Sequence, residues 1–302
     1  MENKKKILVI GGTGFIGYHL IKRCLQKSYN VTCISSRTSS KKKRFSKVKY
    51  LICDIRDKKK LSKIITSRYN FVVNLGGYVD HSKKRETLTS HYDGCKNLVK
   101  ILLKFNIENF VQIGSGLEYG NRKSPQKENL RCSPKSNYGL AKFKATNFLM
   151  KLYEKNKFPC TILRLYQAYG PEQDFNRLIP IVIKSCLKGE RFACSEGLQK
   201  RDFLYIDDFI NLIFKIFSNK RSRGRIFNAG SGKPIKIKSL IEKIKKISKG
   251  GIPEYGKIEM RKDEIDIMYP NIKLSREILN WSPKVTLDNG LKKTVKFYRE
   301  KY

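Results

Sequence analysis

The sequence predicts an α/β protein built on a doubly wound parallel sheet, with a smaller α/β region at its C-terminal side. Two observations lead to this prediction. Short apolar segments alternate with helical patterns through the first half of the chain, which is typical of a parallel sheet with helices on both faces. A glycine-rich turn follows the first apolar segment, Ile7–Ile10, and opens a helix.

The individual elements follow from this alternation. The predicted strands of the sheet are Ile7–Ile10, Val31–Ser35, Tyr50–Cys53, Phe71–Leu75, Phe110–Ile113 and Cys160–Leu165. After Gly170-Pro171 the rhythm loosens into a helix at Leu178–Leu187, strands at Phe203–Ile206 and Ile226–Ala229, and an amphipathic helix at Ser239–Ser248. We expect residues 1–170 to form the first domain, to which a segment near 202–230 returns, and residues 171–302 to form the second region.

Composition limits the class of protein. With 302 residues, of which 40% are hydrophobic, the chain can bury a core. It contains no apolar run of about 18 residues, and Lys4–Lys6 lead straight into the first strand without the features of a signal peptide. We therefore expect a cytoplasmic protein. Eight scattered cysteines and three histidines predict reduced, mostly buried thiols and no metal site.

The formal charge of +39 suggests an anionic partner. The lysines are spread along the whole chain, however, and no nucleic-acid recognition motif accompanies them. Specific nucleic-acid binding is therefore not expected as the main function. The charge would still attract an anionic cofactor and a diphosphate-bearing substrate.

The glycine-rich turn reads Gly11-Gly12-Thr13-Gly14-Phe15-Ile16-Gly17. Gly11 permits the tight turn, Gly14 lets the backbone approach a pyrophosphate, and Gly17 lets the helix pack closely on the strand. Amides at the start of the helix then hold the anion. The sequence therefore predicts a dinucleotide on a Rossmann-type sheet, with a purely structural turn as the alternative.

The segment about 20 residues after this turn distinguishes the two nicotinamide dinucleotides. An acidic side chain there would bind the ribose 2′-hydroxyl of NAD, but this chain has Ser36 and Arg37 and no carboxylate. Ser36 can donate a hydrogen bond to a 2′-phosphate, and Arg37 can add a charge-assisted contact. We therefore favour NADP(H). NAD(H) is the alternative, because Arg37 would equally suit the start of a solvated basic loop, Thr38–Lys47.

A phenol and an ammonium group lie one helical turn apart, at Tyr138 and Lys142. Tyrosine has an ordinary pKa of about 10, but the Lys142 charge and a nicotinamide ring would favour the phenolate. Tyr138 could then exchange a proton with a substrate oxygen while hydride moves at the adjacent carbon. Ser115 follows a predicted strand and could give that oxygen a second hydrogen bond. An ordinary N-cap or turn serine is the alternative.

Several motifs occur in a fixed order along the chain. They are Gly11–Gly17, Asp54–Asp57, Asn74–Gly77, Gly94–Leu98, Ser115, Tyr138 with Lys142, Arg201–Phe203 and Asn280–Pro283. In this order, over nearly the whole chain, they resemble the extended short-chain dehydrogenases/reductases, the NAD-dependent epimerase/dehydratase family. The resemblance implies a dinucleotide in the first domain, a nucleotide sugar in the second region, and a homodimer formed by helices near Gly94–Leu103 and Tyr138–Tyr153.

The resemblance also implies which residues contact the two ligands. The cofactor would contact Gly11, Thr13, Gly14, Phe15, Ile16, Gly17, Ser36, Arg37, Asp54, Ile55, Leu75, Gly76, Gly77, Tyr138, Lys142 and Tyr166. The substrate would contact His81, Gly116, Gln167, Asn176, Arg201 and Arg261. Within this set, Asp54 and Ile55 should line the adenine. Arg201 and Arg261 should hold the substrate diphosphate, for which arginine is physically suited.

Members of this family carry out 4,6-dehydration, 4-epimerisation or 4-keto reduction. Dehydratases have an Asp-Glu pair directly after the catalytic hydroxyl residue, where this chain has Gly116 and Leu117. Epimerases usually have asparagine at the position of Gln167 and an acidic ribose partner. The segments Asn74–Ser82, Ser195–Asp208 and Arg261–Pro270 are similar to CDP-abequose and CDP-paratose synthases, which reduce a 4-keto deoxysugar with NADPH.

We therefore expect an oxidoreductase that reduces the 4-keto group of a nucleotide-linked deoxysugar, in surface-polysaccharide sugar biosynthesis. An NAD-dependent nucleotide-sugar 4-epimerase is the first alternative. A non-catalytic scaffold that binds RNA or another anion is the alternative outside the enzymes. Gly114, where many relatives have serine, is expected to loosen the loop that holds Ser115.

Overall fold

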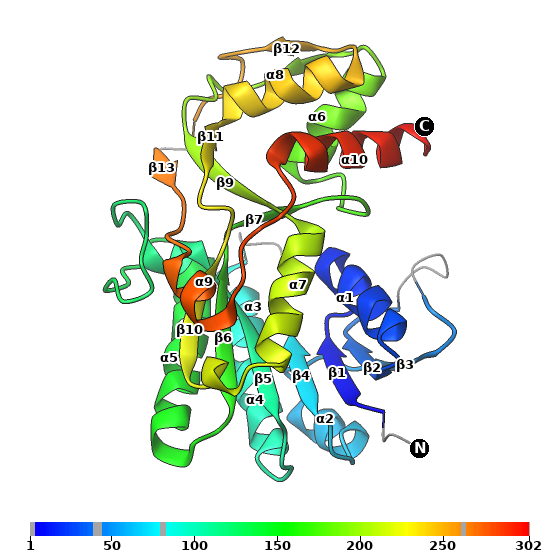
Figure 1. Cartoon of the computed structure of the whole chain (residues 1–302), viewed down its shortest axis with the longest axis vertical. Helices are drawn as coiled ribbons and strands as arrows, with labels where there is room; N and C mark the ends of the chain where they lie inside the picture. The colour runs from blue at the N-terminus through cyan, green and yellow to red at the C-terminus, as the bar shows by residue number, and fades with distance from the viewer. Residues whose placement is uncertain (1–3, 39–43, 79–82, 261–263, 302) are drawn as a thin grey trace.

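The computed structural model describes residues 4–38, 44–78, 83–260 and 264–301. Within these ranges, seven strands form one sheet, and every pair of neighbours is parallel. In sheet order the strands are β10 (Arg225–Ala229), β6 (Cys160–Leu165), β5 (Asn109–Ser115), β4 (Phe71–Asn74), β1 (Lys6–Ile10), β2 (Asn30–Ser35) and β3 (Val48–Ile52) (Figure 1). The predicted doubly wound parallel sheet is confirmed.

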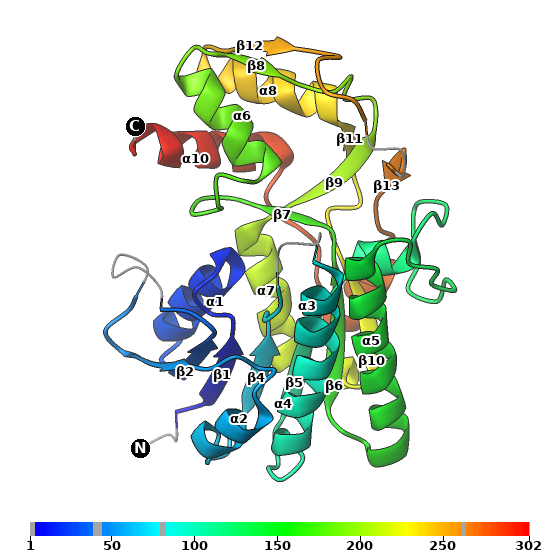
Figure 2. The same ribbon diagram turned by 180° about the vertical axis from the view of Figure 1, so that it is seen from behind.

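Helices cover both faces of this sheet. α1 (Phe15–Gln26) and α7 (Ile206–Phe217) lie on the face turned toward the viewer in Figure 1. α2 (Lys58–Ile64), α3 (Lys84–Leu88), α4 (Gly94–Leu102) and α5 (Asn137–Asn156) lie on the other face (Figure 2). Side chains of β1 alternate between two apolar cores, because Ile7 packs with α1 and α7 whereas Leu8 packs with α4 and α5. Burial on both faces explains why the strand reads as a continuous apolar run.

A smaller α/β region stands over the carboxyl ends of the main strands. Its sheet has β9 (Lys200–Tyr205) at the centre, paired with β7 (Gln167–Tyr169), β11 (Pro234–Lys236) and β13 (Ile267–Met268). Beside it lie α6 (Leu178–Leu187), α8 (Ile237–Ser248), α10 (Leu287–Arg299) and a two-stranded sheet of β8 (Arg191–Ala193) and β12 (Ile252–Glu254). The apolar face of α8 is buried against α6 and α10, which accounts for its amphipathic pattern.

The chain passes between the two regions more than once. After β9 it descends through α7 and the short helix η4 (Lys220–Ser222), adds β10 beside β6, and then climbs back to β11. Near the C-terminus it passes through α9 (Lys273–Leu279), which packs beside β10, before it reaches α10. The predicted strand at Phe203–Ile206 begins three residues earlier than expected, at Lys200, and ends one residue earlier, at Tyr205, because Ile206 begins α7.

The cysteines and the apolarity of the helices bear on two predictions from composition. All eight cysteines are free thiols; seven are buried and Cys132 is half-buried, as expected for reduced core residues. Among the described residues, no helix has the length and apolarity needed to cross a membrane.

Candidate active site

Three adjoining cavities lie at the carboxyl ends of the main strands. The switch-point cavity, of about 400 Å³, lies where the strand order reverses between β1 and β4; its walls include Gly11, Thr13, Gly14, Ser36, Arg37, Asp54, Ile55, Leu75, Gly76 and Gly77. The Tyr138 cavity, of about 330 Å³, includes Phe15, Ile16, Gly17, Ser115, Gly116, Tyr138, Lys142, Tyr166 and Gln167. The Arg201 cavity, of about 530 Å³, includes Gln167, Asn176, Arg177 and Arg201. Shared wall residues connect the cavities into one groove.

The structure therefore brings together all the described residues that the sequence assigns to the two ligands. His81 and Arg261 lie outside the described residues. The position of the groove, beyond the carboxyl ends of parallel strands and at the reversal of strand order, is where open α/β sheets bind ligands.

The glycine turn is shaped for an anion. Gly11 has φ +74°, and its amide donates to the Ile34 carbonyl at 2.7 Å, which fixes the turn. A Cβ on Gly17 would lie 2.4 Å from the Gly12 Cα, so only glycine lets α1 approach so closely. Gly14 is the N-cap of α1 and has no side chain with which to cap it. Amides of the first helical turn therefore face the groove, as phosphate binding requires.

The far wall of the switch-point cavity is cationic. Ser36 and Arg37 are exposed at the end of β2. Arg56 lines the same cavity and forms a bidentate ion pair with Asp54, with Nε–Oδ1 at 3.0 Å and Nη2–Oδ2 at 2.6 Å. This contact lowers the pKa of Asp54. The carboxylate is thus already neutralised by Arg56, whose place in the cavity the sequence analysis missed.

The loop that carries Asp54 and Arg56 is anchored from α4. The Asn97 side chain donates to the Arg56 carbonyl at 3.0 Å, and the Ile55 side chain fills the space left by Gly94, where a Cβ would meet it at 2.6 Å. These contacts give a physical role to the Gly94–Leu98 motif.

In the Tyr138 cavity, three functional side chains converge from β5 and α5. Ser115 ends β5, while Tyr138 and Lys142 stand on the first turns of α5, whose start is fixed by a hydrogen bond from the Gly139 amide to Ser136 Oγ at 3.0 Å. Ser115 lines the same cavity as the phenol of Tyr138 and lowers its pKa. The Lys142 ammonium donates to the Ile113 carbonyl at 2.7 Å.

The electrostatics of this trio differ from the expectation of a phenol made acidic by lysine. Shielding from water raises the pKa of Tyr138 to about 12, with a further increase from Glu118, while Arg177 and Ser115 oppose it. Burial lowers the pKa of Lys142 to about 8. In the protein by itself desolvation thus keeps the phenol from becoming acidic. The expected acidification also involves the positive charge of a bound nicotinamide, and for that state it stays a prediction.

Ser115 is the N-cap residue that the alternative interpretation suggested, while its hydrogen bond to a substrate oxygen stays a prediction. Its Oγ accepts from the Leu117 amide at 3.2 Å and caps the short helix η3 (Gly116–Tyr119), while its backbone amide donates to Glu118 Oε1 at 2.9 Å. The expected loosening at Gly114 is also wrong. A Cβ on Gly114 would lie 2.4 Å from Glu118 Oε1, so the Glu118 carboxylate fills the space that a side chain would need.

The Tyr166 side chain is fixed in the wall of the Tyr138 cavity by its own contacts. Its hydroxyl donates to Gln126 Oε1 at 2.6 Å, and its ring packs on Gly116, where a Cβ would lie 2.9 Å from the ring. Gly116 is therefore a glycine for steric reasons.

Sequence reasoning missed two further residues beside Tyr138. The His91 ring meets the phenol edge to face at 5.1 Å, from the single π-helical turn η2 (Thr89–Asp93), and Gly77 makes room for it. Arg177 borders both the Tyr138 and Arg201 cavities. The only signal for Arg177 is its place beside Asn176; nothing in the local pattern predicts a π-helix at His91.

Arg201 faces its cavity with its charge already partnered. It donates to the Lys200 carbonyl at 2.8 Å and forms an ion pair with Glu264. Burial lowers its pKa, and Glu264 opposes that effect. A substrate diphosphate at this position would share the guanidinium with Glu264.

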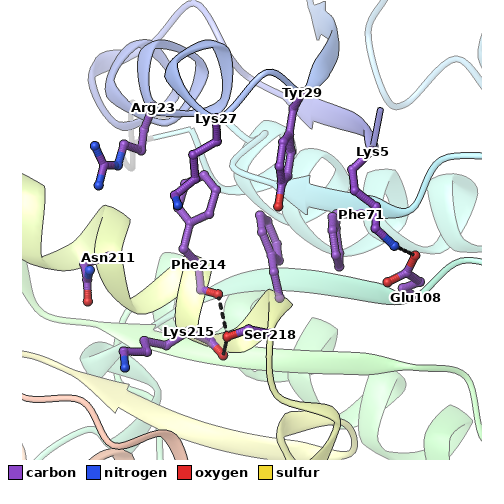
Figure 3. A pocket seen from close by; sticks show the side chains of 11 residues that line it. Lys5, Arg23, Lys27, Tyr29, Phe71, Glu108, Asn211, Phe214, Lys215 and Ser218 are labelled. Carbon is purple, nitrogen blue, oxygen red and sulfur yellow. Dashed lines mark hydrogen bonds and ion pairs between the residues drawn. The ribbon is translucent and has the colours of Figure 1, made fainter. Parts of the chain in front are cut away.

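A separate cavity lies at the opposite, amino-terminal edge of the sheet (Figure 3). Its walls combine basic and aromatic side chains, including Lys5, Lys27, Phe71 and Phe214. The Lys5 ammonium lies 2.6 Å from Glu108, and the Lys27 ammonium lies 5.6 Å from the Phe214 ring centre. None of the residues assigned to cofactor or substrate lies here.

The chain is similar to known proteins over nearly its whole length. The sequence model of the NAD dependent epimerase/dehydratase family matches residues 7–230. A putative UDP-glucose 4-epimerase of Methanocaldococcus jannaschii is 30% identical, over 97% of this chain and 98% of that protein. The dTDP-D-glucose 4,6-dehydratase of Homo sapiens is 30% identical, over 99% of this chain and 91% of that protein. CDP-abequose synthase of Salmonella muenchen is 27% identical, over 97% and 98%.

The fold of the chain is also similar to that of a solved structure. The UDP-glucuronic acid 4-epimerase of Bacillus cereus, in complex with UDP-glucuronic acid and NAD, matches with a TM-score of 0.87 at 26% identity, covering 98% of this chain and 100% of that chain. Epimerase, dehydratase and synthase names thus occur among relatives of comparable identity. Similarity alone leaves the reaction open.

Proposed function

Because the chain belongs to the NAD-dependent epimerase/dehydratase family, whose members act on nucleotide sugars, we propose that it uses NADPH to reduce the 4-keto group of a nucleotide-linked deoxysugar. The observation that carries this proposal is the state of Tyr138. Its phenol lies in one cavity with Ser115 and with Lys142, whose ammonium is 5.5 Å from the centre of the Tyr138 ring, and burial raises its pKa to about 12. At neutral pH it therefore holds the proton that a ketone oxygen must receive.

The described residues divide the work between them. The nicotinamide, when bound, supplies hydride to the carbonyl carbon. Tyr138 donates its proton to the carbonyl oxygen, and Ser115 steadies that oxygen with a second hydrogen bond. Lys142 places a positive charge behind the phenol, which stabilises the phenolate left after proton transfer.

The cationic wall of the switch-point cavity supports NADP(H). Arg37 and Arg56 border the space expected for the ribose, and the nearby carboxylate of Asp54 is taken up by Arg56. A 2′-phosphate would meet the Arg37 guanidinium there, and the Asp54 carboxylate would not repel it because Arg56 compensates its charge.

The surroundings of Ser115 argue against elimination of water. Gly116 and Leu117 carry no acid or base, and the Tyr166 ring closes the space at Gly116. Glu118, the nearest carboxylate along the chain, is fully buried and paired with Arg164. A dehydratase needs both an acid and a base beside the sugar, and these side chains do not offer them.

A 4-epimerase is the second candidate, favoured by the similarity to the Methanocaldococcus jannaschii protein. The deciding experiment incubates the chain with NADPH and a nucleotide-linked 4-keto-6-deoxyhexose and follows the absorbance of NADPH. Loss of one NADPH per sugar reduced supports the proposal. Interconversion of UDP-glucose and UDP-galactose, without net consumption of cofactor, selects the epimerase instead.

A homodimer remains a prediction supported by the surface of two helices. α4 and α5 lie next to each other on the outer face in Figure 2, and Leu103 and Leu140 expose hydrophobic side chains at their ends. The cytoplasmic location and the place in surface-polysaccharide synthesis also remain predictions from the sequence.

A further inference from the structure

Glu118 is a fully buried carboxylate that lies directly behind the reacting groups. One oxygen, Oε1, accepts from the Ser115 backbone amide at 2.9 Å, and the other, Oε2, accepts from Arg164 Nε at 2.9 Å. Arg164 is itself only 3% exposed. A buried carboxylate is retained only when its oxygens are satisfied in this way.

Arg164, Gly114 and the Ser115 amide together fix the position of the Glu118 carboxylate. Arg164 is held in place by the Tyr119 ring, 4.5 Å from its centre, and by the Glu128 carbonyl at 3.3 Å. Gly114 pairs with Arg164 across β5 and β6, and any side chain at Gly114 would collide with Glu118 Oε1. Strand register, helix η3 and the ion pair therefore fix the Ser115 amide together.

The capping of η3 alone does not account for this arrangement. A capping box needs only the reciprocal bonds between Ser115 and Glu118, and these are usually made at the solvated start of a helix. Here the second carboxylate oxygen accepts a hydrogen bond from Arg164, and both side chains are buried.

The charge of Glu118 also reaches the proton donor. It raises the pKa of both Tyr138 and Lys142. The other groups that face the phenol are Arg177, which lowers its pKa, Ser115, His91 and Lys142. Cys95 faces Lys142, and Cys132 lies near the Glu118–Arg164 pair.

We propose that Glu118 is a positioning residue: its carboxylate, locked by Arg164, holds the Ser115 amide so that the Ser115 hydroxyl meets the Tyr138 phenol, and it keeps a negative charge beside that phenol. This inference rests on the proposed function only in requiring that Tyr138 transfers a proton. It applies equally to reduction and to epimerisation.

Two variants separate the two effects of Glu118. Glu118→Gln keeps an oxygen for the Ser115 amide and removes the charge. Without the negative charge of Glu118 the Tyr138 phenolate is repelled less, so the pKa of Tyr138 falls. The high-pH limit of kcat then moves to lower pH. Gly114→Ala keeps the charge and pushes the carboxylate aside, so kcat falls on the order of 10²-fold while the KM for NADPH is unchanged.

Glu128→Gln is the matched control. The backbone carbonyl of Glu128 accepts from Arg164 at 3.3 Å, and its carboxylate accepts from the Asn228 amide at 2.9 Å. Its neutralisation should disturb Arg164 and lower the melting temperature without moving the pH limit of kcat. An equal displacement of that limit in Glu128→Gln and Glu118→Gln would reduce Glu118 to a structural residue and overturn the proposal.

A second measurement does not depend on turnover. Rapid pH-jump absorbance detects tyrosinate, and the difference between each protein and its Tyr138→Phe counterpart isolates Tyr138. The tyrosinate step should appear at lower pH in Glu118→Gln than in the parent chain. An unchanged step would overturn the proposal even if no substrate is turned over, whereas a parent chain that epimerises would overturn only the proposed function.

Discussion

The hydroxyl of Ser115 caps the helix η3 and lines the same cavity as Tyr138, where it lowers the pKa of the phenol. The side chain therefore cannot turn toward solvent without uncapping the helix, so the structural role would also hold the hydroxyl for its proposed chemical role. The position of Ser115 is set by the backbone of β5, an interior strand in which every residue is buried.

Tyr138→Phe removes the proton donor and leaves the ring in place. We expect kcat to fall on the order of 10²–10⁴-fold. Affinity for NADPH, followed by its fluorescence, should change little, because the glycine turn and the cationic wall are untouched. Ser115→Ala is the comparison, and its kcat should fall less, since it removes only the second hydrogen bond. A Tyr138→Phe enzyme that keeps full turnover would contradict the assignment.

Arg37→Ala tests the choice of cofactor. Loss of the charge-assisted contact should raise the Kd for NADPH by about tenfold and leave the Kd for NADH unchanged. Arg68→Ala is the control, because Arg68 is equally exposed but lies before β4, at the opposite edge of the sheet. Equal effects on NADPH and NADH, or an effect of the same size in the control, would mean that Arg37 belongs to a general basic surface.

Lys142→Met should lower the activity and raise the free energy of unfolding. Burial lowers the pKa of Lys142 from 10.5 to about 8, so the folded chain binds the proton less tightly than the unfolded chain. The unfolded chain then binds more protons between these values, and stability rises with pH. Below pH 8 the buried ammonium costs roughly 3 kcal/mol, of which about 1 kcal/mol is offset by its bond to Ile113.

The Met variant should therefore be about 2 kcal/mol more stable at pH 6, with a smaller gain at pH 10 and little activity. Urea denaturation at the two pH values, followed by circular dichroism, checks both the sign and the pH window. A gain that grows with pH would refute the direction of the pKa shift.

Arg201→Gln tests the proposed contact with a substrate phosphate in the Arg201 cavity. We expect KM for the nucleotide sugar to rise by about tenfold or more with kcat nearly unchanged, because the lost contact holds the substrate and does not touch the reacting carbon. Arg191→Gln is a suitable control, since Arg191 pairs with Glu254 on the exposed two-stranded sheet. A fall in kcat without a change in KM would place Arg201 in a different role.

Much of the fold follows from local sequence. The strands from β1 to β6 are close to their predicted bounds because a buried parallel strand is an apolar run that ends at turn residues. The helix α7 was not predicted, although Asp207 and Asp208 lie in its first turn, because the preceding strand-like residues run into it without a break. Short strands such as β13 depend on their partners in β9 and leave no periodic signal.

The sequence by itself determined the protein family and the candidate side chains. These are the glycines of the turn, and a tyrosine, a lysine and a serine at recognisable spacings. Tertiary structure decided the electrostatics. The pKa of Tyr138, the neutralisation of Asp54 by Arg56 and the pair of Glu118 with Arg164 all depend on burial and on residues from separate strands and loops. Desolvation and Coulomb interactions are set by distance in space, and spacing along the chain does not contain that distance.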